Sequence, residues 1–397
     1  MKYYIIAGEA SGDLHGSNLM KGIYESDPEA EIRFWGGDMM MAVHKNFQNT
    51  SSQTSGNYSG LVRHYKEGAI MGFWEVLKNA GKLLGNVRSC KKDIIANNPD
   101  VIILIDYPGF NFKIAEFAHK RGFKVFYYIA PKVWASREGR IKKLKAYVDK
   151  LFIVFPFEIP YFESKGIDFI YKGNPLVDAV DNSPAMNESR EDFLKRNNLD
   201  DKPFIAMLAD SRKGEINTMM PVLKEFAHRM RSIPQYKDYQ FLVAGAPART
   251  IEDYSPFLGP EDDFIKVLFG QTQHIIRNAE AAVVNSGTAS LETVLFGTPQ
   301  VVGYIGSRIT YMIARHIVKI KYISLGNLIV NRLAFKEFIQ DECNAEALVR
   351  EVRLLIEDKA YRGKMLSEYI VIRNLLGGAG ASASVAQAMI SELKDKV

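Results

Sequence analysis

The sequence is poor in cysteine, with only Cys90 and Cys343 in 397 residues. Two isolated thiols form neither a disulfide scaffold nor a set of zinc ligands, so a reducing compartment is expected. The chain also lacks an apolar run near the roughly 20 residues that span a bilayer, and it opens without the features of a signal peptide. We therefore expect a cytoplasmic protein whose contact with any membrane is peripheral.

Two common nucleotide-binding motifs are absent from the glycine-rich segment that follows the first apolar run. Gly8, Gly12 and Gly16 are spaced G-x3-G-x3-G, which fits neither the dinucleotide fingerprint G-x-G-x-x-G nor the P-loop. The acidic run 261–263 lies in a polar loop and not at the end of a strand. The sequence therefore predicts chemistry without a metal ion or other cofactor.

Short apolar runs alternate with helical patterns in two parts of the chain, 1–180 and 204–374. Such alternation predicts parallel strands joined by crossover helices. The polar stretch 181–203 is interpreted as a linker that holds a short helix, and the C-terminal helical segment 375–397 is assigned to the first domain. The predicted fold class is α/β, with two tandem Rossmann-like, doubly wound parallel-sheet domains. The expected strands are 3–6, 31–35, 101–105, 125–129 and 151–155, then 204–208, 241–244, 264–268, 281–284 and 300–304.

Glu9, Ser11, Asp13 and His15 lie in the turn that follows the first predicted strand. A plain strand-to-helix turn needs one N-cap, which Ser11 or Asp13 would supply. The additional carboxylate, imidazole and glycines indicate a ligand that approaches the backbone closely. Asp106 ends another apolar strand, where catalytic groups of α/β sheets gather. Burial would raise the pKa of this carboxyl and make it a usable general base, and a helix cap is the alternative.

Ser286, Gly287 and Thr288 follow a buried strand and open a helix. The free N–H groups and the positive dipole end of such a helix suit a phosphate. Glu292, one turn further on, could accept hydrogen bonds from a ribose, and Arg212 could hold a diphosphate with paired hydrogen bonds. The alternatives are an N-cap, an ordinary helical glutamate and a surface arginine.

Two segments have the composition of lipid-facing surfaces. Residues 70–84 include Met71, Phe73 and Trp74, and 307–322 interleaves apolar residues with lysine and arginine. The second pattern is typical of a helix on an anionic membrane surface, although core packing is the commoner fate of apolar stripes. The basic stretch 137–145 lacks interleaved aromatics and any known module pattern, so no nucleic-acid partner is predicted.

Several specific motifs stand in order along essentially the whole chain: AGEASGD at 7–13, MG with EVL at 71–77, IDYPGFN at 105–111, PKVWA at 131–135, FPFE at 155–158, GNPL at 173–176, SGTASLE at 286–292 and YISLGNL at 322–328. Together they resemble the motifs of the lipid-A-disaccharide synthases, a family of inverting glycosyltransferases of GT-B fold in Gram-negative outer-membrane biosynthesis.

This resemblance implies transfer of a diacylglucosamine from UDP-2,3-diacylglucosamine to the 6-hydroxyl of 2,3-diacylglucosamine 1-phosphate (lipid X). The products are a β-1,6 disaccharide 1-phosphate and UDP, formed at the cytoplasmic face of the inner membrane. The resemblance places the family's essential aspartate on Asp106, with Asp13 and His15 as alternative bases. It places donor-binding residues on Arg212 and Asn327. The acceptor is expected on the first domain, near Glu9, Ser11 and the 70–84 segment.

The chain departs from the family motifs at several positions. Ala209-Asp210 replaces Pro-Gly ahead of Ser211-Arg212, Gly326 replaces a proline, and Leu333 replaces a glutamate. These changes put the donor contacts near Asp210 and Leu333 in question. Two other functions stay open: a UDP-N-acetylglucosamine 2-epimerase-like enzyme of the same architecture, and a non-catalytic peripheral lipid-binding protein. Acyl-chain length and oligomeric state also stay open, a homodimer included.

Overall fold

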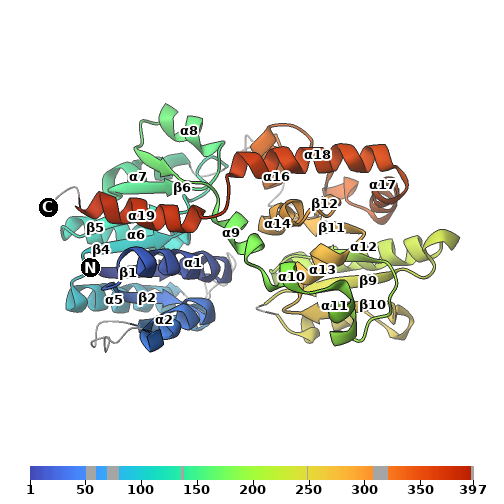
Figure 1. Ribbon diagram of the computed structural model, residues 1–397, viewed down its shortest axis with the longest axis horizontal. Helices are drawn as coiled ribbons and strands as arrows, with labels where there is room; N and C mark the ends of the chain where they lie inside the picture. The colour runs from blue at the N-terminus through green and yellow to red at the C-terminus, as the bar shows by residue number, and fades with distance from the viewer. Residues whose placement is uncertain (51–59, 69–79, 136–137, 248, 307–320, 395–397) are drawn as a thin grey trace. The chain divides into compact units, whose positions relative to one another are not determined.

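The computed structural model describes residues 1–50, 60–68, 80–135, 138–247, 249–306 and 321–394. The chain divides into two compact units, Met1–Ala179 with Leu376–Val397, and Val180–Leu375. It passes from one unit to the other near the end of α9 and again at the end of α18 (Figure 1). Met71, Phe73, Trp74 and most of the basic amphipathic segment lie outside the described residues.

The first unit is built on a seven-stranded sheet with the order β3-β2-β1-β4-β5-β6-β7, in which every described pair of neighbours is parallel. Its central strands are buried on both faces, which is why they are near-continuous apolar runs. The strands are β1 (Lys2–Ala7), β2 (Glu31–Gly36), β3 (Gly60–His64), β4 (Val101–Ile105), β5 (Lys124–Tyr128), β6 (Lys150–Ile153) and β7 (Phe169–Tyr171).

Helices cover both faces of this sheet, and each face has its own apolar core. α1, α2 and α19 contribute to one core, and α5, α6 and α7 contribute to the other. The helices are α1 (Ala10–Ser26), α2 (Asp38–Thr50), α3 (Tyr65–Gly68), α5 (Ala80–Asn97), α6 (Pro108–Lys120), α7 (Ile141–Tyr147), α8 (Glu158–Ser164), α9 (Pro175–Asp181) and α19 (Ala381–Lys394).

The C-terminal helix α19 packs against α1, although the two are far apart in sequence (Figure 1). Its apolar face, with Val385, Met389 and Ile390, is buried in the same core as Leu19 and Ile23 of α1. The C-terminal segment is therefore an integral part of the first unit.

The second unit repeats the topology with a six-stranded sheet of order β10-β9-β8-β11-β12-β13, again with every described pair parallel. The strands are β8 (Phe204–Leu208), β9 (Gln240–Gly245), β10 (Ile265–Phe269), β11 (Ala281–Asn285), β12 (Gln300–Tyr304) and β13 (Glu337–Ile339). The helices are α10 (Pro184–Asn187), α11 (Arg190–Arg196), α12 (Lys213–Arg231), α13 (Thr272–Asn278), α14 (Thr288–Phe296), α16 (Leu325–Val330), α17 (Ala345–Glu357) and α18 (Lys359–Leu376).

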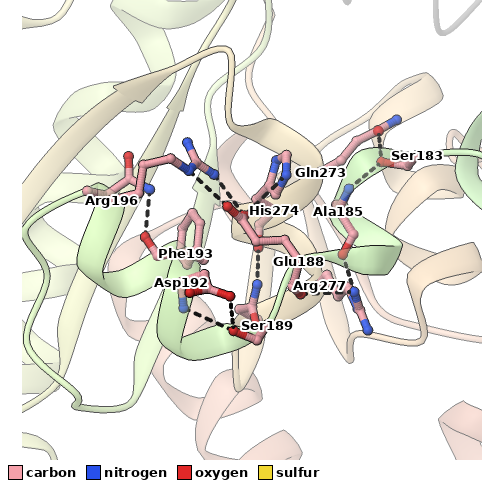
Figure 2. Close-up of polar contacts among 12 residues, drawn as sticks. Ser183, Ala185, Glu188, Ser189, Asp192, Phe193, Arg196, Gln273, His274 and Arg277 are labelled. Atoms are coloured by element: carbon pink, nitrogen blue, oxygen red, sulfur yellow. Dashed lines mark hydrogen bonds and ion pairs between the residues drawn. The ribbon is translucent and has the colours of Figure 1, made fainter.

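The stretch 181–203, interpreted from the sequence as a linker, is folded onto the second unit. It forms α10 and α11, and Phe193 and Leu194 of α11 are buried in the core of that unit. Figure 2 shows the polar contacts that accompany this packing: the Glu188 carboxylate accepts from Arg196 at 2.8 and 2.9 Å and lies 3.3 Å from His274 Nε2. The linker interpretation missed this packing because only one Phe-Leu pair marks the buried face.

The ten predicted strands are all present, and none of their ends differs by more than two residues. The sequence analysis missed β3, β7 and β13, which are three of the four edge strands of the two sheets and are only partly buried. Short strands at a sheet edge do not need the continuous apolar run that reveals a central strand.

We expect Gly22→Ala to lower the free energy of unfolding by about 1 to 3 kcal/mol through overpacking. A β-carbon at Gly22 would lie 2.8 Å from Ala383 Cα and 3.0 Å from Ala386 Cβ, so α1 and α19 could not keep their present distance. Gly85→Ala in α5 is the matched control, because no described atom lies within 4 Å of its added carbon. The control should gain about 0.5 to 1 kcal/mol from helix propensity. Urea denaturation measures the free energy of unfolding of both variants. The same change in both would contradict the close packing of α1 on α19.

Candidate active site

Each sheet has one point where the strand order reverses, and most of the predicted site residues that the structure describes follow the strands that meet there. The reversal lies between β1 and β4 in the first unit and between β8 and β11 in the second. The register pairs Ala7 with Ile105 and Leu208 with Val284. The loops that follow these strands therefore leave each sheet side by side, at the place where α/β sheets bind ligands.

Asp106 leaves β4 in an unusual backbone conformation that its neighbours hold in place. Asp106 and Tyr107 have φ values of +42° and +43°, in the left-handed region that non-glycine residues rarely adopt. The Asp106 carbonyl accepts hydrogen bonds from Tyr127 Oη at 2.6 Å and Asn111 Nδ2 at 2.8 Å, and its N–H donates to the Tyr128 carbonyl at 3.1 Å. Backbone strain held by such contacts is typical of functional sites.

The electrostatic surroundings of Asp106 suit a general base. Burial raises the pKa of its carboxyl to about 6, and the negative charge of Glu9 adds to the rise. The positive charges of Lys132 and Arg140 act in the opposite direction. A carboxylate with a pKa of about 6 is largely ionised at neutral pH and still has useful affinity for a proton.

The first loop packs directly on the loop that carries Asp106. A side chain at Gly8 would collide with the ring of Tyr107, so the glycine allows this close approach. Tyr107 stacks on Phe110 at 5.5 Å between ring centroids, and Phe110 lies 5.3 Å from Trp35. The sequence analysis attributed the glycines to a ligand close to the backbone, but at Gly8 the group that comes close is a ring of the protein itself.

The structure gives the Asp13 carboxylate a scaffold role, in contrast to the predicted catalytic one. Asp13 is 3% exposed and accepts hydrogen bonds from the backbone N–H groups of Gly37, Met39 and Met40 at 2.7 to 3.1 Å, which caps α2. The pKa of His15 is lowered to about 4 by burial, and its Nδ1 has no partner among the described residues. Of the three candidate bases, Asp106 is the best poised.

Glu9 and Ser11, predicted to bind the acceptor, are exposed at the start of α1. Glu9 is the N-cap residue of that helix, and its carbonyl accepts the N–H of Asp13. Their side chains are therefore open to solvent beside the Asp106 loop.

Two motifs to which the sequence analysis gave no role are joined by a buried carboxylate. Glu158, 1% exposed, accepts Trp134 Nε1 at 3.1 Å and the backbone N–H groups of Val154 and Phe155, also at 3.1 Å. Burial nevertheless raises its pKa to about 7. This contact holds the 131–135 loop, and with it the exposed Lys132, beside the Asp106 carboxylate.

In the second unit, the turn after β11 opens α14 as predicted from the sequence. Gly287 has φ +153° and ψ −159°, which side-chain-bearing residues rarely adopt. Asn285 ties the turn to β8, because its Oδ1 accepts the Ser286 N–H at 2.7 Å and its Nδ2 reaches the Ala209 carbonyl at 3.5 Å. Thr288 is exposed at the first turn of the helix, whose N-terminal dipole end favours an anion.

Glu292 lies one turn into α14, and burial raises its pKa. Its Oε1 accepts a hydrogen bond from Gln273 Nε2 at 3.1 Å, and this contact partly offsets the effect of burial. The residue is therefore held by a neighbouring helix, α13, which the sequence analysis did not connect with it.

Asn327 does not have the open position expected of a ligand-binding side chain. It is 0% exposed, with Nδ2 bonded to the Phe335 carbonyl and to Glu337, and Oδ1 accepting the Ala334 N–H at 2.8 Å. Glu337 also accepts the N–H groups of residues 323 and 324, and Ser286 Oγ donates to the carbonyl of residue 323 at 3.2 Å. Asn327 therefore shapes the loop beside the α14 turn, and any effect on a donor would be indirect.

Arg212, at the N-cap of α12, is exposed and faces two carboxylates. Its Nη1 donates to Glu215 Oε1 at 3.2 Å, and its N–H reaches Asp210 Oδ1 at 3.4 Å. The pKa of Glu215 is raised to about 7, first by burial and then by the charge of Asp210. Asp210 stands where the family motif has glycine and keeps a left-handed φ of +92°. The departure from the motif therefore adds both strain and negative charge beside the arginine.

The described residues include no group of three or more histidine, cysteine, aspartate or glutamate side chains arranged to hold a metal ion. Within the same residues, no helix is long and apolar enough to cross a membrane.

A family model described as Lipid-A-disaccharide synthetase matches residues 3–388. The lipid-A-disaccharide synthase of Geobacter metallireducens is 35% identical over 393 residues, which is 99% of this chain and 97% of that protein. The synthase of Coxiella burnetii is 31% identical over 384 residues, 96% of each chain. This chain belongs to the lipid-A-disaccharide synthetase family.

As a member of the lipid-A-disaccharide synthetase family, the protein is a glycosyltransferase of lipid A biosynthesis, which confirms the function predicted from its motifs. Solved structures confirm the GT-B fold class. The UDP-GlcNAc 2-epimerase of Neisseria meningitidis bound to UDP-GlcNAc gives a TM-score of 0.70 at 12% identity, covering 98% of this chain and 100% of the other. The UDP-N-acetylglucosamine 2-epimerase of Rickettsia bellii gives a TM-score of 0.62 at 14% identity, covering 99% of this chain and 97% of the other. At sequence identities this low, the structural similarity shows a shared fold and no more.

Residues near the two candidate sites escaped the sequence analysis as candidates for a role, among them Lys132, Glu215 and Gln273. Glu215 stands three residues after Arg212 on a predicted helix, so the i,i+3 spacing was a usable signal. Lys132 lay inside a quoted motif but had no partner visible in sequence. Gln273 meets Glu292 across 19 residues, and no local pattern marks that contact.

We expect Asp210→Gly to raise the free energy of unfolding by about 1 kcal/mol. Glycine removes the backbone strain of a left-handed aspartate, which stabilises the folded state by about 1 to 3 kcal/mol. Glycine also gives the unfolded chain more conformational freedom, which offsets about 0.4 to 1 kcal/mol of this gain. Loss of the charge beside Arg212 should also tighten UDP binding by about threefold. Thermal unfolding and calorimetric titration measure the two effects.

Asn331→Gly is the matched control for Asp210→Gly. Asn331 also has a left-handed φ, +50°, but asparagine tolerates this region, so stability should change by less than about 0.5 kcal/mol. If Asp210→Gly destabilises the protein, the Asp210 carboxylate stabilises the turn more than its backbone strains it.

Proposed function

We propose that this glycosyltransferase joins UDP-2,3-diacylglucosamine to 2,3-diacylglucosamine 1-phosphate, giving the β-1,6-linked disaccharide 1-phosphate and UDP. The observation that carries the proposal is Asp106: a carboxylate at the switch point of the first sheet, with a clamped left-handed backbone and a pKa raised by burial to about 6. Membership of the family supplies the reaction class.

In the proposed mechanism, Asp106 takes the proton of the acceptor's 6-hydroxyl as that oxygen attacks the anomeric carbon of the donor. Attack comes from the face opposite UDP, so the bond to the diphosphate breaks with its electron pair on UDP and the configuration inverts. Asp13 is disfavoured as the base because three backbone N–H groups already occupy its carboxylate. His15 is disfavoured because burial lowers its pKa to about 4.

The donor is proposed to bind the second unit. Its diphosphate would lie at the start of α14, near Ser286, Gly287 and Thr288. The Arg212 guanidinium would then bind the diphosphate in place of the Glu215 carboxylate. Its ribose would hydrogen-bond to Glu292. Because an arginine and a helix N-terminus would meet the diphosphate charge, we propose that the reaction needs no metal ion.

The acceptor is proposed to bind the first unit, beside Glu9, Ser11 and the Asp106 loop, and to be drawn from the cytoplasmic face of the inner membrane. The exposed Lys132 lies close enough to Asp106 to lower its pKa, so it is available to a phosphorylated acceptor. The UDP-N-acetylglucosamine 2-epimerase alternative has only the shared fold in its favour.

The direct test incubates the full chain with both substrates in detergent and EDTA and follows disaccharide 1-phosphate and UDP by mass spectrometry. We expect product from the unmodified protein and a kcat at least about 100-fold lower for Asp106→Asn, which keeps the shape of the side chain but cannot take the proton. Asp13→Asn provides the comparison: loss of its capping role should appear mainly as reduced stability. If the two lipids stay intact while UDP-N-acetylglucosamine is epimerised, the transfer proposal is wrong.

The pH profile of kcat/KM tests the electrostatics of Asp106. Only the ionised carboxylate can accept the proton, so the rate should rise with pH through a midpoint near 6. Lys132→Met should move this midpoint up, because it removes a positive charge that lowers the pKa. Glu9→Gln should move it down, because it removes a negative charge that raises the pKa.

Lys142→Met, on the exposed side of α7, is the control for the pH profile and should leave the midpoint in place. Opposite shifts for Lys132→Met and Glu9→Gln identify Asp106 as the titrating group. An identical midpoint in all four proteins would assign the titration elsewhere.

A further inference from the structure

Gln273 of α13 joins the predicted ribose-binding residue to the segment where the chain enters the second unit. Its Nε2 donates to Glu292 Oε1 at 3.1 Å, and its Oε1 accepts the hydroxyl of Ser183 at 2.5 Å. Ser183 is 2% exposed and comes two residues after α9 ends. Figure 2 shows Ser183 and Gln273 joined by this contact.

The directions assigned to these hydrogen bonds are consistent with one another. Its oxygen is the N-cap of α10 and accepts the Ala185 N–H at 3.1 Å, so its own hydrogen is free to be donated. The recipient is Gln273 Oε1. An amide whose oxygen faces a hydroxyl donor must turn its NH₂ group the other way, here toward Glu292.

A donor at this position favours the ionised form of Glu292, whose pKa burial raises. Several other polar and charged groups on the described neighbouring elements have partners of their own. On α13, His274 pairs with Glu188, and Arg277 donates to the Ala185 carbonyl. On β12, Gln300 Nε2 donates to the Ser290 carbonyl at 2.8 Å. The described parts of α16 carry no charged side chain. Gln273 is thus the donor that the structure directs at Glu292.

We propose that Gln273 is a positioning residue for the nucleotide: oriented by Ser183, it holds the Glu292 carboxylate in the place and form that accept hydrogen bonds from the two ribose hydroxyls. The inference rests on the proposed donor site, and it adds a residue that contacts no substrate itself. It predicts a specific loss of ribose recognition when the amide is removed, without loss of phosphate binding.

The test compares binding of UDP and 2′,3′-dideoxy-UDP to the full chain by calorimetry. Gln273→Met, which nearly keeps the side-chain volume, should weaken UDP binding by about five- to tenfold. The affinity for dideoxy-UDP should stay within about twofold of that of the unmodified protein. Gln235→Met, at an exposed glutamine of another segment, is the matched control and should change neither. The loss should be larger at pH 5.5 than at pH 8, because Glu292 without its donor holds its proton to a higher pH. Comparing each variant with the unmodified protein cancels the titration of the phosphate itself.

A double-mutant cycle separates positioning from a general structural effect. In a Glu292→Gln background, Gln273→Met should change UDP binding by less than about twofold, because the residue acts only through Glu292. If Gln273→Met weakens UDP and dideoxy-UDP equally, or is equally harmful in that background, the inference is wrong. If Glu292→Gln itself leaves the preference for UDP unchanged, the proposed ribose contact fails first, and the donor site must be reassigned.

Discussion

The parallel pairing of the first strand of each unit with its fourth is the constraint on which both candidate sites depend. In parallel sheets all carboxyl ends meet at one edge, and the reversal of strand order leaves a space between the loops at one point. β1 and β4 place Gly8 beside Asp106, and β8 and β11 place Ala209 beside Asn285. Residues far apart in sequence thus become neighbours through backbone pairing alone.

Several strands, two of them at these points, end in a strained backbone. Asp106 after β4, Ile129 after β5 and Asp210 after β8 all have positive φ, which glycine adopts most readily. Ile129 is the most unusual, because a β-branched residue is rarely found there. The cost is local, and the buried sheet on which these residues stand offsets it. A more relaxed turn would point the Asp106 carboxyl elsewhere.

The sequence was sufficient to predict the central strands and the residues at their carboxyl ends, because a buried parallel strand is an apolar run whose last residue is visible. It was not sufficient to predict what each polar side chain contacts. Asp13 and Asn327 are polar residues in motif positions, yet one caps a helix and the other supports a loop. Their partners lie 24 to 27 and 7 to 10 residues away, and only the folded chain brings them together.

The carboxylates near the two candidate sites differ in the number of hydrogen bonds that they accept. Asp13, Glu158 and Glu337 each accept at least three hydrogen bonds, mostly from backbone N–H groups, and each holds a loop beside a site. Glu292 accepts one side-chain donor, and burial raises its pKa and that of Asp106. A carboxylate whose oxygens already accept several hydrogen bonds gains little from a substrate hydroxyl. A buried carboxylate with unused lone pairs has lost its hydrogen bonds to water, so a substrate hydroxyl supplies a hydrogen bond that it would otherwise lack. By this physical criterion Asp106 and Glu292 have the acceptor capacity that the proposed substrate contacts require, whereas Asp13, Glu158 and Glu337 are already engaged with the protein.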